Sequence, residues 1–246
     1  MSTEDEHQFM VQILYHVANE HLFDISFGNN YALRWAAEYG YDNLVRLLLK
    51  HPNADPSDKD NYAIKMACEN GHFHVVKTLL SDPRVDPSSE INLYSSSANG
   101  RIEVVKLLLA DPRVDPRQSD CISVAAEYGN LAVVKALLAD GRANPCADDN
   151  YAIQMAYQNE HTEVVRLLLA DPRVDIGTHL RKGKRGTCSI CLKSTVSITS
   201  CGHHFHKVCL AMWLLAGLQG EPASAGSQTC PMCRQDISDE KAKNNC

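Results

Sequence analysis

Residues Asn61–Leu80 read NYAIKMACENGHFHVVKTLL, and residues Asn150–Leu169 read NYAIQMAYQNEHTEVVRLLL. Three weaker copies of this stretch lie at 30–49, 90–109 and 119–138. Each copy has one residue at its middle where two helices would join, and these residues are Gly40, Gly71, Gly100, Gly129 and Glu160, at spacings of 31, 29, 29 and 31. Self-similarity at such a period indicates an array of stacked structural repeats.

Each copy predicts a pair of short helices. The second piece places Val75, Val76, Leu79 and Leu80 on one helical face. Glycine between the two pieces suits a left-handed C-cap, and the proline-containing segment Asp82–Pro87 ends the second helix in an extended turn. A unit of this size cannot bury its apolar face alone, so we expect neighbouring units to stack on one another.

The copies resemble the ankyrin repeat. The resemblance rests on an A-A-x-x-G-x-x-x-V-V-x-L-L-L core, seen in the first copy as Ala36, Ala37, Gly40, Val45, Leu47, Leu48 and Leu49. The family's T-P-L-H opening is replaced by N-Y-A-I or N-Y-A-L, and the repeat is two to four residues shorter than is usual in the family. The resemblance implies a mainly α fold, with about five ankyrin-like repeats forming an α-solenoid over 29–177. Residues 1–28 are expected to supply an N-terminal capping helix.

Residues that recur in every repeat are expected to serve the stack. Arginines at one such position should pair with nearby aspartates, and they are Arg84, Arg113, Arg142 and Arg173. His72 and His161 at the interhelix turn are expected to be structural. The ankyrin resemblance implies protein binding on a concave face, for which non-recurring tip residues are the candidates: Lys59, Ser88, Arg117 and Asp148. The serines at 95–97 either weaken the third repeat or fit slots that suit small residues.

A second pattern lies near the C-terminus and has the chemistry of zinc ligands. It comprises Cys188, Cys191, Cys201, His203, His206, Cys209, Cys230 and Cys233, with C-x2-C pairs at both ends. Thiolates at this spacing grip a tetrahedral ion, and eight ligands supply two complete sets of four. His204 does not fit the spacing. Residues 187–236 are too few for a self-sufficient core, and structural zinc can contribute roughly 10–16 kcal/mol to folding.

The ligand order resembles the two-histidine RING finger. The resemblance implies that ligand pairs alternate between two ions, with Cys188, Cys191, His206 and Cys209 at the first ion and Cys201, His203, Cys230 and Cys233 at the second. Each site would then have four protein ligands and no open position, so the two Zn²⁺ ions would be structural rather than hydrolytic.

Other residues of this segment match the RING surface that binds a ubiquitin-conjugating enzyme. The resemblance implies a groove formed by Ile190, Trp213 and Pro231. It also makes Arg234, which follows the last ligand, the contact that activates ubiquitin. A purely structural role in the small core is the alternative for the apolar members of this set.

Composition limits the remaining function classes. The chain has 246 residues, 44% of them hydrophobic, a formal net charge of −6 and ten cysteines. Its longest apolar run, Leu210–Leu218, is far shorter than the roughly 18–20 residues of a membrane helix. No signal peptide is recognisable, so a cytoplasmic or nuclear location is expected. The sequence has no basic stripe with interleaved aromatic residues, so nucleic-acid binding is not expected. Residues 178–186 are predicted to form a basic flexible linker and 237–246 a polar tail.

Taken together, the two patterns resemble ankyrin-repeat RING-type E3 ubiquitin ligases. The array would bind a protein substrate, and the RING finger would recruit and activate a ubiquitin-loaded conjugating enzyme without any covalent intermediate on this chain. The alternative is a non-catalytic ankyrin/RING scaffold or adaptor.

Overall fold

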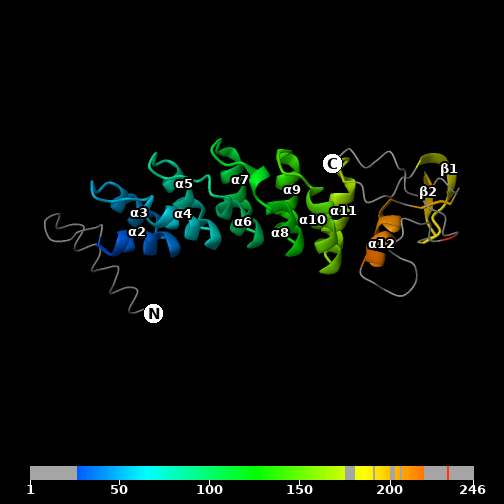
Figure 1. Cartoon of the computed structure of the whole chain (residues 1–246), viewed down its shortest axis with the longest axis horizontal. Coiled ribbons are helices and arrows are strands. Elements are labelled where there is room, and N and C mark those ends of the chain that lie inside the picture. The colour runs from blue at the N-terminus through cyan, green and yellow to red at the C-terminus, as the bar shows by residue number, and fades with distance from the viewer. Residues whose placement is uncertain are drawn as a thin grey trace. The chain divides into compact units, whose positions relative to one another are not determined.

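The structure is a computed structural model of the whole chain, and it describes residues 27–174, 181–190, 192–199, 203–205, 207–218 and 232. In this part of the chain, paired helices are followed by a small sheet and one further helix (Figure 1). The chain divides into two compact units, Met1–Cys121 and Ile122–Cys246. The mainly α fold predicted from the repeats is confirmed.

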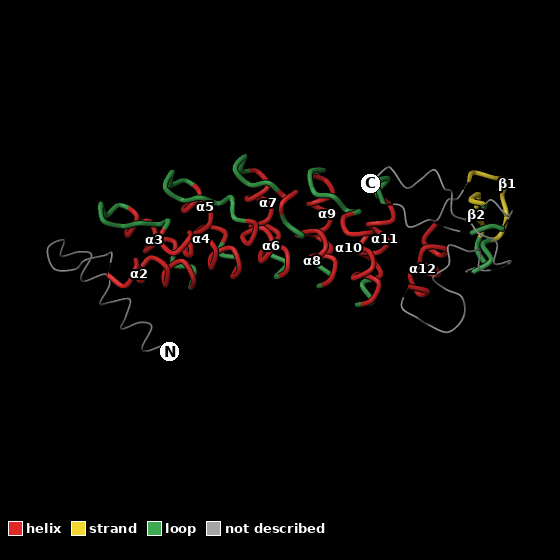
Figure 2. The backbone as a smooth tube through the Cα atoms, in the orientation of Figure 1, coloured by secondary structure: helices red, strands yellow, loops and turns green. Residues whose placement is uncertain are grey.

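The first unit holds three helix pairs. They are α2 (Phe27–Glu38) with α3 (Asp42–Leu49), α4 (Asp58–Asn70) with α5 (Phe73–Leu80), and α6 (Glu90–Ala98) with α7 (Ile102–Ala110), followed by a 3-10 turn, η1 (Pro116–Gln118). Each first helix packs on the next first helix, and each second helix packs on the next second helix. The loops that follow α3, α5 and α7 project from one side of the helices (Figure 2). The buried side chains between successive pairs include Val45, Val75 and Val105.

The second unit begins with two more helix pairs and ends with the cysteine-rich segment. Its elements are α8 (Cys121–Glu127), α9 (Leu131–Asp140), α10 (Ala147–Gln158), α11 (Thr162–Ala170), β1 (Arg181–Thr187), β2 (Ser194–Ile198) and α12 (Lys207–Leu218). Strands β1 and β2 pair in antiparallel fashion, with an irregularity between Lys182 and Gly186. Helix α12 packs against both α10 and α11.

Two predicted boundaries differ from this description or fall outside it. The predicted flexible linker 178–186 is wrong for residues 181–186, because they form most of β1 and pair with β2. The backbone of this segment satisfies its hydrogen bonds in the sheet even though the side chains show no alternation of apolar and polar residues. Residues 1–26 of the predicted capping helix and the predicted tail 237–246 lie outside the described residues.

The turn between the paired helices has the left-handed backbone that the glycines predicted. Gly40, Gly71, Gly100 and Gly129 have φ between 66° and 81°, and Glu160 has φ of 61°. A side chain at three of these glycines would also collide with the next repeat. A Cβ on Gly40 would meet the ring of His72, one on Gly71 the side chain of Arg101, and one on Gly129 the ring of His161. Glycine is therefore required both by backbone conformation and by the close approach of a neighbour.

The two turn histidines are structural, as predicted. His72 Nε2 hydrogen-bonds the carbonyl of Glu38 at 2.8 Å, and His161 Nε2 hydrogen-bonds the carbonyl of Glu127 at 2.9 Å. Each ring thus crosses to the preceding repeat and supplies a donor to the end of its first helix, where carbonyls lack intrahelical partners.

The recurring arginines bind their local aspartates, as predicted, and they also reach the preceding repeat. Arg84 pairs with Asp82 at 2.6 Å and donates to the carbonyls of Leu49 at 3.3 Å and Ala54 at 2.6 Å. Arg113 pairs with Asp111 at 2.7 Å and donates to the carbonyls of Leu80 at 3.1 Å and Val85 at 3.0 Å.

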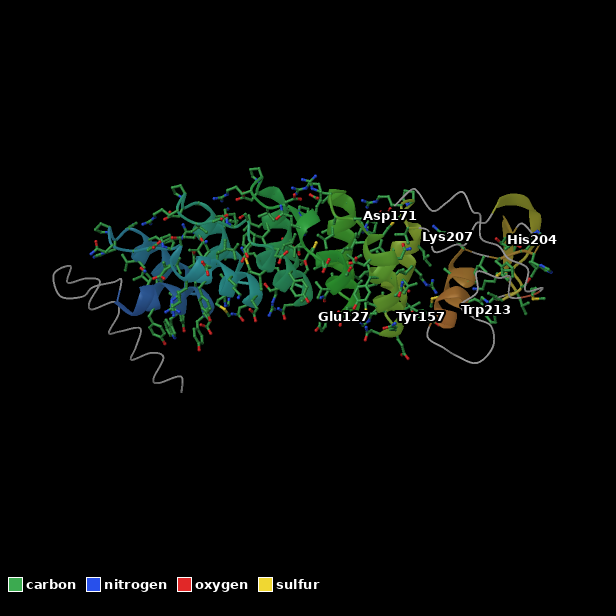
Figure 3. The ribbon with its side chains drawn as sticks, in the orientation of Figure 1. Glu127, Tyr157, Asp171, His204, Lys207 and Trp213 are labelled. Carbon is green, nitrogen blue, oxygen red and sulfur yellow. The ribbon has the colours of Figure 1, made fainter. Side chains whose placement is uncertain are left out.

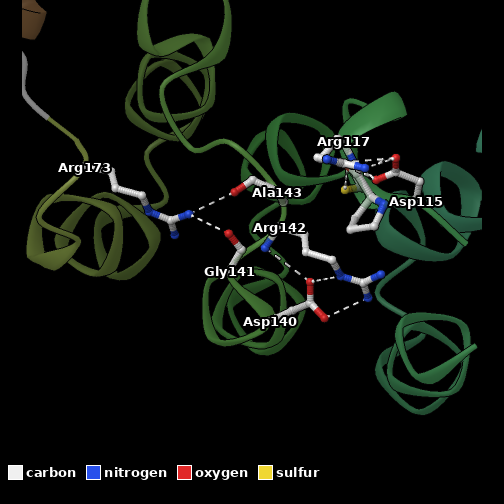
Figure 4. Close-up of polar contacts among 9 residues, drawn as sticks. Asp115, Arg117, Asp140, Gly141, Arg142, Ala143 and Arg173 are labelled. Carbon is white, nitrogen blue, oxygen red and sulfur yellow. Dashed lines mark hydrogen bonds and ion pairs between the residues drawn. The ribbon is translucent and has the colours of Figure 1, made fainter. Parts of the chain in front are cut away.

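A related arrangement occurs in the second unit. Arg173 pairs with Asp171. It also donates to the carbonyls of Gly141 and Ala143, both at 3.1 Å (Figure 4). Arg142 pairs with Asp140 at 2.8 Å. The hydrogen bond from each arginine side chain lowers the pKa of its aspartate, seen for Asp111 and Asp171. These pairs therefore contribute stability above the unfolded carboxyl pKa of about 4, which is lost as the pH falls through the lower folded value.

The asparagine that opens the repeat has a role that the sequence did not reveal. Asn30 and Asn61 have φ of 54° and 59°, so each adopts the left-handed conformation. The Asn30 side-chain oxygen accepts from the backbone N–H of Asp55, and that of Asn61 accepts from the N–H of Asp86, both at 2.8 Å. Each asparagine therefore fixes the start of its own repeat to the hairpin that follows. Only the absence of the usual T-P-L-H opening marked this position in the sequence.

The serines of the third repeat occupy slots for small residues. Ser95 donates to the carbonyl of Ile91 at 2.7 Å, and Ser96 donates to that of Asn92 at 2.6 Å. Ser96 is fully buried and also reaches the carbonyl of Cys68 in the preceding repeat at 3.3 Å. This geometry favours the second of the two sequence-based interpretations.

We expect Arg113→Ala to lower the free energy of unfolding by about 1–2 kcal/mol, because the Asp111 carboxylate and two carbonyls lose a shared donor at a partly exposed site. Urea denaturation measures this change. Arg117→Ala is the matched control: Arg117 has the same Asp-x-Arg spacing, but its hydrogen bonds within the described residues are to Asp115 alone. It should leave the transition unchanged. Equal effects of the two substitutions would show that the bonds between repeats contribute nothing.

We expect Glu160→Gly to raise the free energy of unfolding by about 1 kcal/mol, because glycine relieves the cost of a left-handed residue. Gly129→Ala should act in the opposite direction and by more, because it adds a collision with the ring of His161. Thermal unfolding of both variants gives the signs of the two changes. Destabilisation by Glu160→Gly would mean that the glutamate makes a contact that outweighs backbone strain.

Candidate metal centre

The first predicted zinc knuckle begins where β1 ends. The Cys188 N–H donates to the carbonyl of Lys193 at 2.8 Å, and the Cys188 carbonyl accepts from the N–H of Leu192 at 2.9 Å. Leu192 has φ of 61°, which turns the chain back toward β2. Cys188 is fully buried in this tight turn, whereas Ile190 near its tip is 44% exposed.

A second loop carries the histidines and is joined to the first turn through the backbone. The Thr199 N–H donates to the carbonyl of His203 at 2.9 Å, and the His203 N–H donates to the Thr199 hydroxyl at 3.2 Å. The Ser189 N–H donates to the carbonyl of His204 at 2.9 Å. Backbone hydrogen bonds therefore hold the Cys188 turn beside the segment that contains His203.

His204, which the ligand spacing left out, has a packing contact of its own. Its ring covers Gly186 of β1 so closely that any side chain at that position would overlap it. This contact gives the imidazole a structural task, and it explains why glycine stands two residues before Cys188.

Helix α12 supplies the module with a further predicted ligand and with half of its described buried apolar residues. Leu210 and Ala211 are fully buried, together with Phe205, which precedes the helix. Cys209 and Trp213 are both half-buried. They are four residues apart, so they lie one turn apart on the same side of the helix.

Three of the eight predicted ligands can be located: Cys188, His203 and Cys209. The other five predicted ligands, Cys191, Cys201, His206, Cys230 and Cys233, lie outside the described residues, as do Pro231 and Arg234. Within the part of the chain that the structure describes, no three histidine, cysteine, aspartate or glutamate side chains converge as a metal site would require. The two ligand sets therefore stay a prediction.

The described donors nevertheless fit zinc in their chemistry. Zinc binds thiolate and imidazole in closed tetrahedral sites, and Cys188 and His203 supply groups of these two kinds. Cys188 stands in a tight backbone turn of the kind that presents two thiolates to one ion. When bound, the metal would supply structural stability.

Comparisons with known protein families agree with both parts of the chain. A family model described as ankyrin repeats in three copies matches residues 2–91 and 93–179, which together cover more than half of the chain. The chain belongs to the ankyrin-repeat family. A second model, described as the Ring finger domain, matches residues 186–234, so a RING finger domain follows the repeats.

One curated relative is similar over a limited stretch. The chain is 34% identical over 87 residues to the E3 ubiquitin-protein ligase RNF128 of Bos taurus. The match covers 29% of this ankyrin-repeat protein and 18% of the relative, so it spans less than two thirds of the relative's length. Separately, none of the described helices combines the length and apolar character that crossing a bilayer requires.

We expect the purified wild-type chain to contain two zinc ions and Cys188→Ser to lose at least one of them. Loss of a ligand removes the metal's contribution to a module with a small core, so the RING segment should unfold while most of the helical circular dichroism remains. Metal analysis and proteolysis measure these changes.

Cys121→Ala is the control for the zinc measurement, because Cys121 is a buried array residue at a position occupied by alanine in other repeats. It should retain both zinc ions. Full zinc content in Cys188→Ser would remove Cys188 from the ligand set.

Proposed function

We propose that this ankyrin-repeat protein is a RING-type E3 ubiquitin-protein ligase. Its RING finger would recruit and activate a ubiquitin-loaded conjugating enzyme, and its ankyrin array would bind the protein substrate. The RING finger match at residues 186–234 is the observation that carries the proposal. The similarity to a named E3 ubiquitin-protein ligase over 87 residues supports it.

The exposure of the described groove residues supports the proposal. Ile190 is 44% exposed at the Cys188 turn, so it is available to a partner. Trp213 is half-buried on α12, one turn beyond the predicted ligand Cys209, so metal binding would fix its position. Pro231 would complete the groove, and Arg234 would contact both ubiquitin and the conjugating enzyme.

The chemistry needs no nucleophile from this chain. The RING finger would hold the thioester-linked ubiquitin in an orientation ready for attack by a substrate lysine. Binding of the substrate to the array would raise the local concentration of that lysine. Two structural zinc ions would maintain the groove without taking part in bond making.

A surface on the first unit is suited to protein binding. The aromatic patch is defined as Tyr31, Arg34, Tyr62, Ile91 and Tyr94, each of which lies nine or six positions before the turn glycine of its repeat. Tyr31 is 47% exposed and Tyr94 43% exposed. The guanidinium of Arg34 lies 5.7 Å from the ring centre of Tyr31 and 5.4 Å from that of Tyr62. Tyrosine and arginine are enriched where proteins bind one another.

The tip residues predicted from the sequence remain candidates for specificity. Lys59, Ser88, Arg117 and Asp148 are all exposed. Arg117 is paired with Asp115 at 2.8 Å, so a partner would have to compete with that carboxylate.

Reconstitution tests the proposal. The wild-type chain, mixed with activating enzyme, ubiquitin and a panel of conjugating enzymes, should form ubiquitin chains or modify itself. Trp213→Ala and Arg234→Ala should each lower the rate at least about tenfold while retaining zinc, because each removes a contact worth roughly 1.4 kcal/mol or more to the reactive complex.

Two outcomes separate the proposal from its alternative. Tyr94→Ala, in the aromatic patch, should leave self-modification intact and reduce modification of array-bound proteins identified by proximity labelling. Absence of ubiquitin transfer with every conjugating enzyme would contradict the ligase function and favour a non-catalytic scaffold. Full activity of Trp213→Ala would remove that residue from the groove.

A further inference from the structure

The first residue of the RING helix makes a contact with the last ankyrin repeat. Lys207 Nζ donates to the carbonyl of Leu169 at 2.8 Å and to that of Val174 at 3.2 Å. Figure 3 shows Lys207 at the beginning of α12, facing the end of α11 near Asp171. The Asp171 carboxylate also attracts the lysine ammonium.

These two carbonyls occupy positions that arginines bind elsewhere in the array. In three repeats the carbonyls that accept from a following side chain stand four and nine residues after a fully or almost fully buried valine, whereas Arg173 donates to those seven and nine residues after Val134. After Val45 they are those of Leu49 and Ala54, which accept from Arg84. After Val76 they are those of Leu80 and Val85, which accept from Arg113. After Val165 they are those of Leu169 and Val174, which accept from Lys207.

A second part of α12 also faces the last repeat. Helix α12 packs on α10 and α11, as the helices of a following repeat pack on those of the repeat before it. Met212 of α12 faces a cavity of about 380 Å³ whose other walls include Ala156, Tyr157 and Val165. Glu160 also lines this cavity. Glu160 therefore faces open space, whereas a side chain at Gly129 would meet the ring of His161.

We propose that the RING helix α12 docks on the last ankyrin repeat in the place of a further repeat, with Lys207 as the counterpart of the recurring arginine. The partner of this end surface is thus a segment of the same chain. The lysine ammonium has one nitrogen, whereas the arginine guanidinium has several. The single Lys207 nitrogen nevertheless reaches both carbonyls that correspond to those bound by arginine in the first two repeats.

Docking in this way leaves the proposed groove accessible, a consequence that rests on the proposed ligase function. Trp213 follows Met212 directly, so it lies about 100° further around the helix, and it does not line the cavity. Ile190 is also exposed while α12 is docked, and it does not line the cavity. The contact would therefore fix the direction of the RING finger without covering these two residues.

Hydrogen exchange of the full-length protein tests the docking independently of activity. In Lys207→Ala, amides of α11 and of residues 171–174 should exchange about tenfold faster, because the repeat end loses a donor to two carbonyls. Lys207→Arg should match the wild type, since arginine fills the same site in other repeats. Unchanged exchange in Lys207→Ala, or equal acceleration in Lys207→Arg, would overturn the proposal.

A second variant separates loss of docking from an effect of the Lys207 substitution on zinc binding. Met212→Ser changes the α12 side chain that faces the last repeat, so it should also accelerate exchange in α10 and α11 while zinc content stays at the wild-type value. Should Lys207→Ala lose zinc, Met212→Ser decides, and unchanged exchange in it would reject the docking. Loss of ubiquitin transfer in an otherwise docked wild-type protein would count against the ligase function alone.

Discussion

Carbonyl groups at the end of each second helix need donors from outside their own repeat. The last turn of any helix leaves such carbonyls unpaired, and a buried unpaired carbonyl costs about 1–3 kcal/mol. In this protein the donor comes from the following repeat. Arg84 donates to the carbonyls of Leu49 and Ala54, and Arg113 donates to those of Leu80 and Val85. Each repeat is thus completed only by its successor. The stability of the stack therefore depends on contacts between repeats more than on the core of any single repeat.

This dependence runs in both directions along the chain. The turn histidines reach back to carbonyls at the end of a preceding first helix, as His72 does to Glu38. The opening asparagines reach forward to the next hairpin, as Asn30 does to Asp55. The glycine turn lets these groups approach, because the ring of His72 occupies the space that a side chain at Gly40 would fill. The left-handed backbone and the contact with the next repeat therefore both require glycine at this turn.

Structural features that recur in every repeat could be predicted from the sequence. Comparison of the five copies distinguishes residues that the stacking requires from residues that vary. The left-handed turns, including that of Glu160, and the aspartate partners of the arginines follow from that comparison. Strand β1 was missed because Arg181–Thr187 has no apolar alternation, and its pairing is carried by the backbone. Lys207 was missed because its role depends on carbonyls of residues 33 and 38 positions away, which leave no local signal.

A docked RING finger and a tethered one would act differently under the proposed function. A flexible tether gives an effective concentration that falls with its length and samples many directions. Docking through Lys207 and Met212 instead limits the directions in which the RING finger can present a conjugating enzyme to a protein held by the array. Such a ligase would favour substrate lysines at a restricted distance from the array. Selection of the modified lysine would then depend on the repeat end as well as on the surface that binds the substrate.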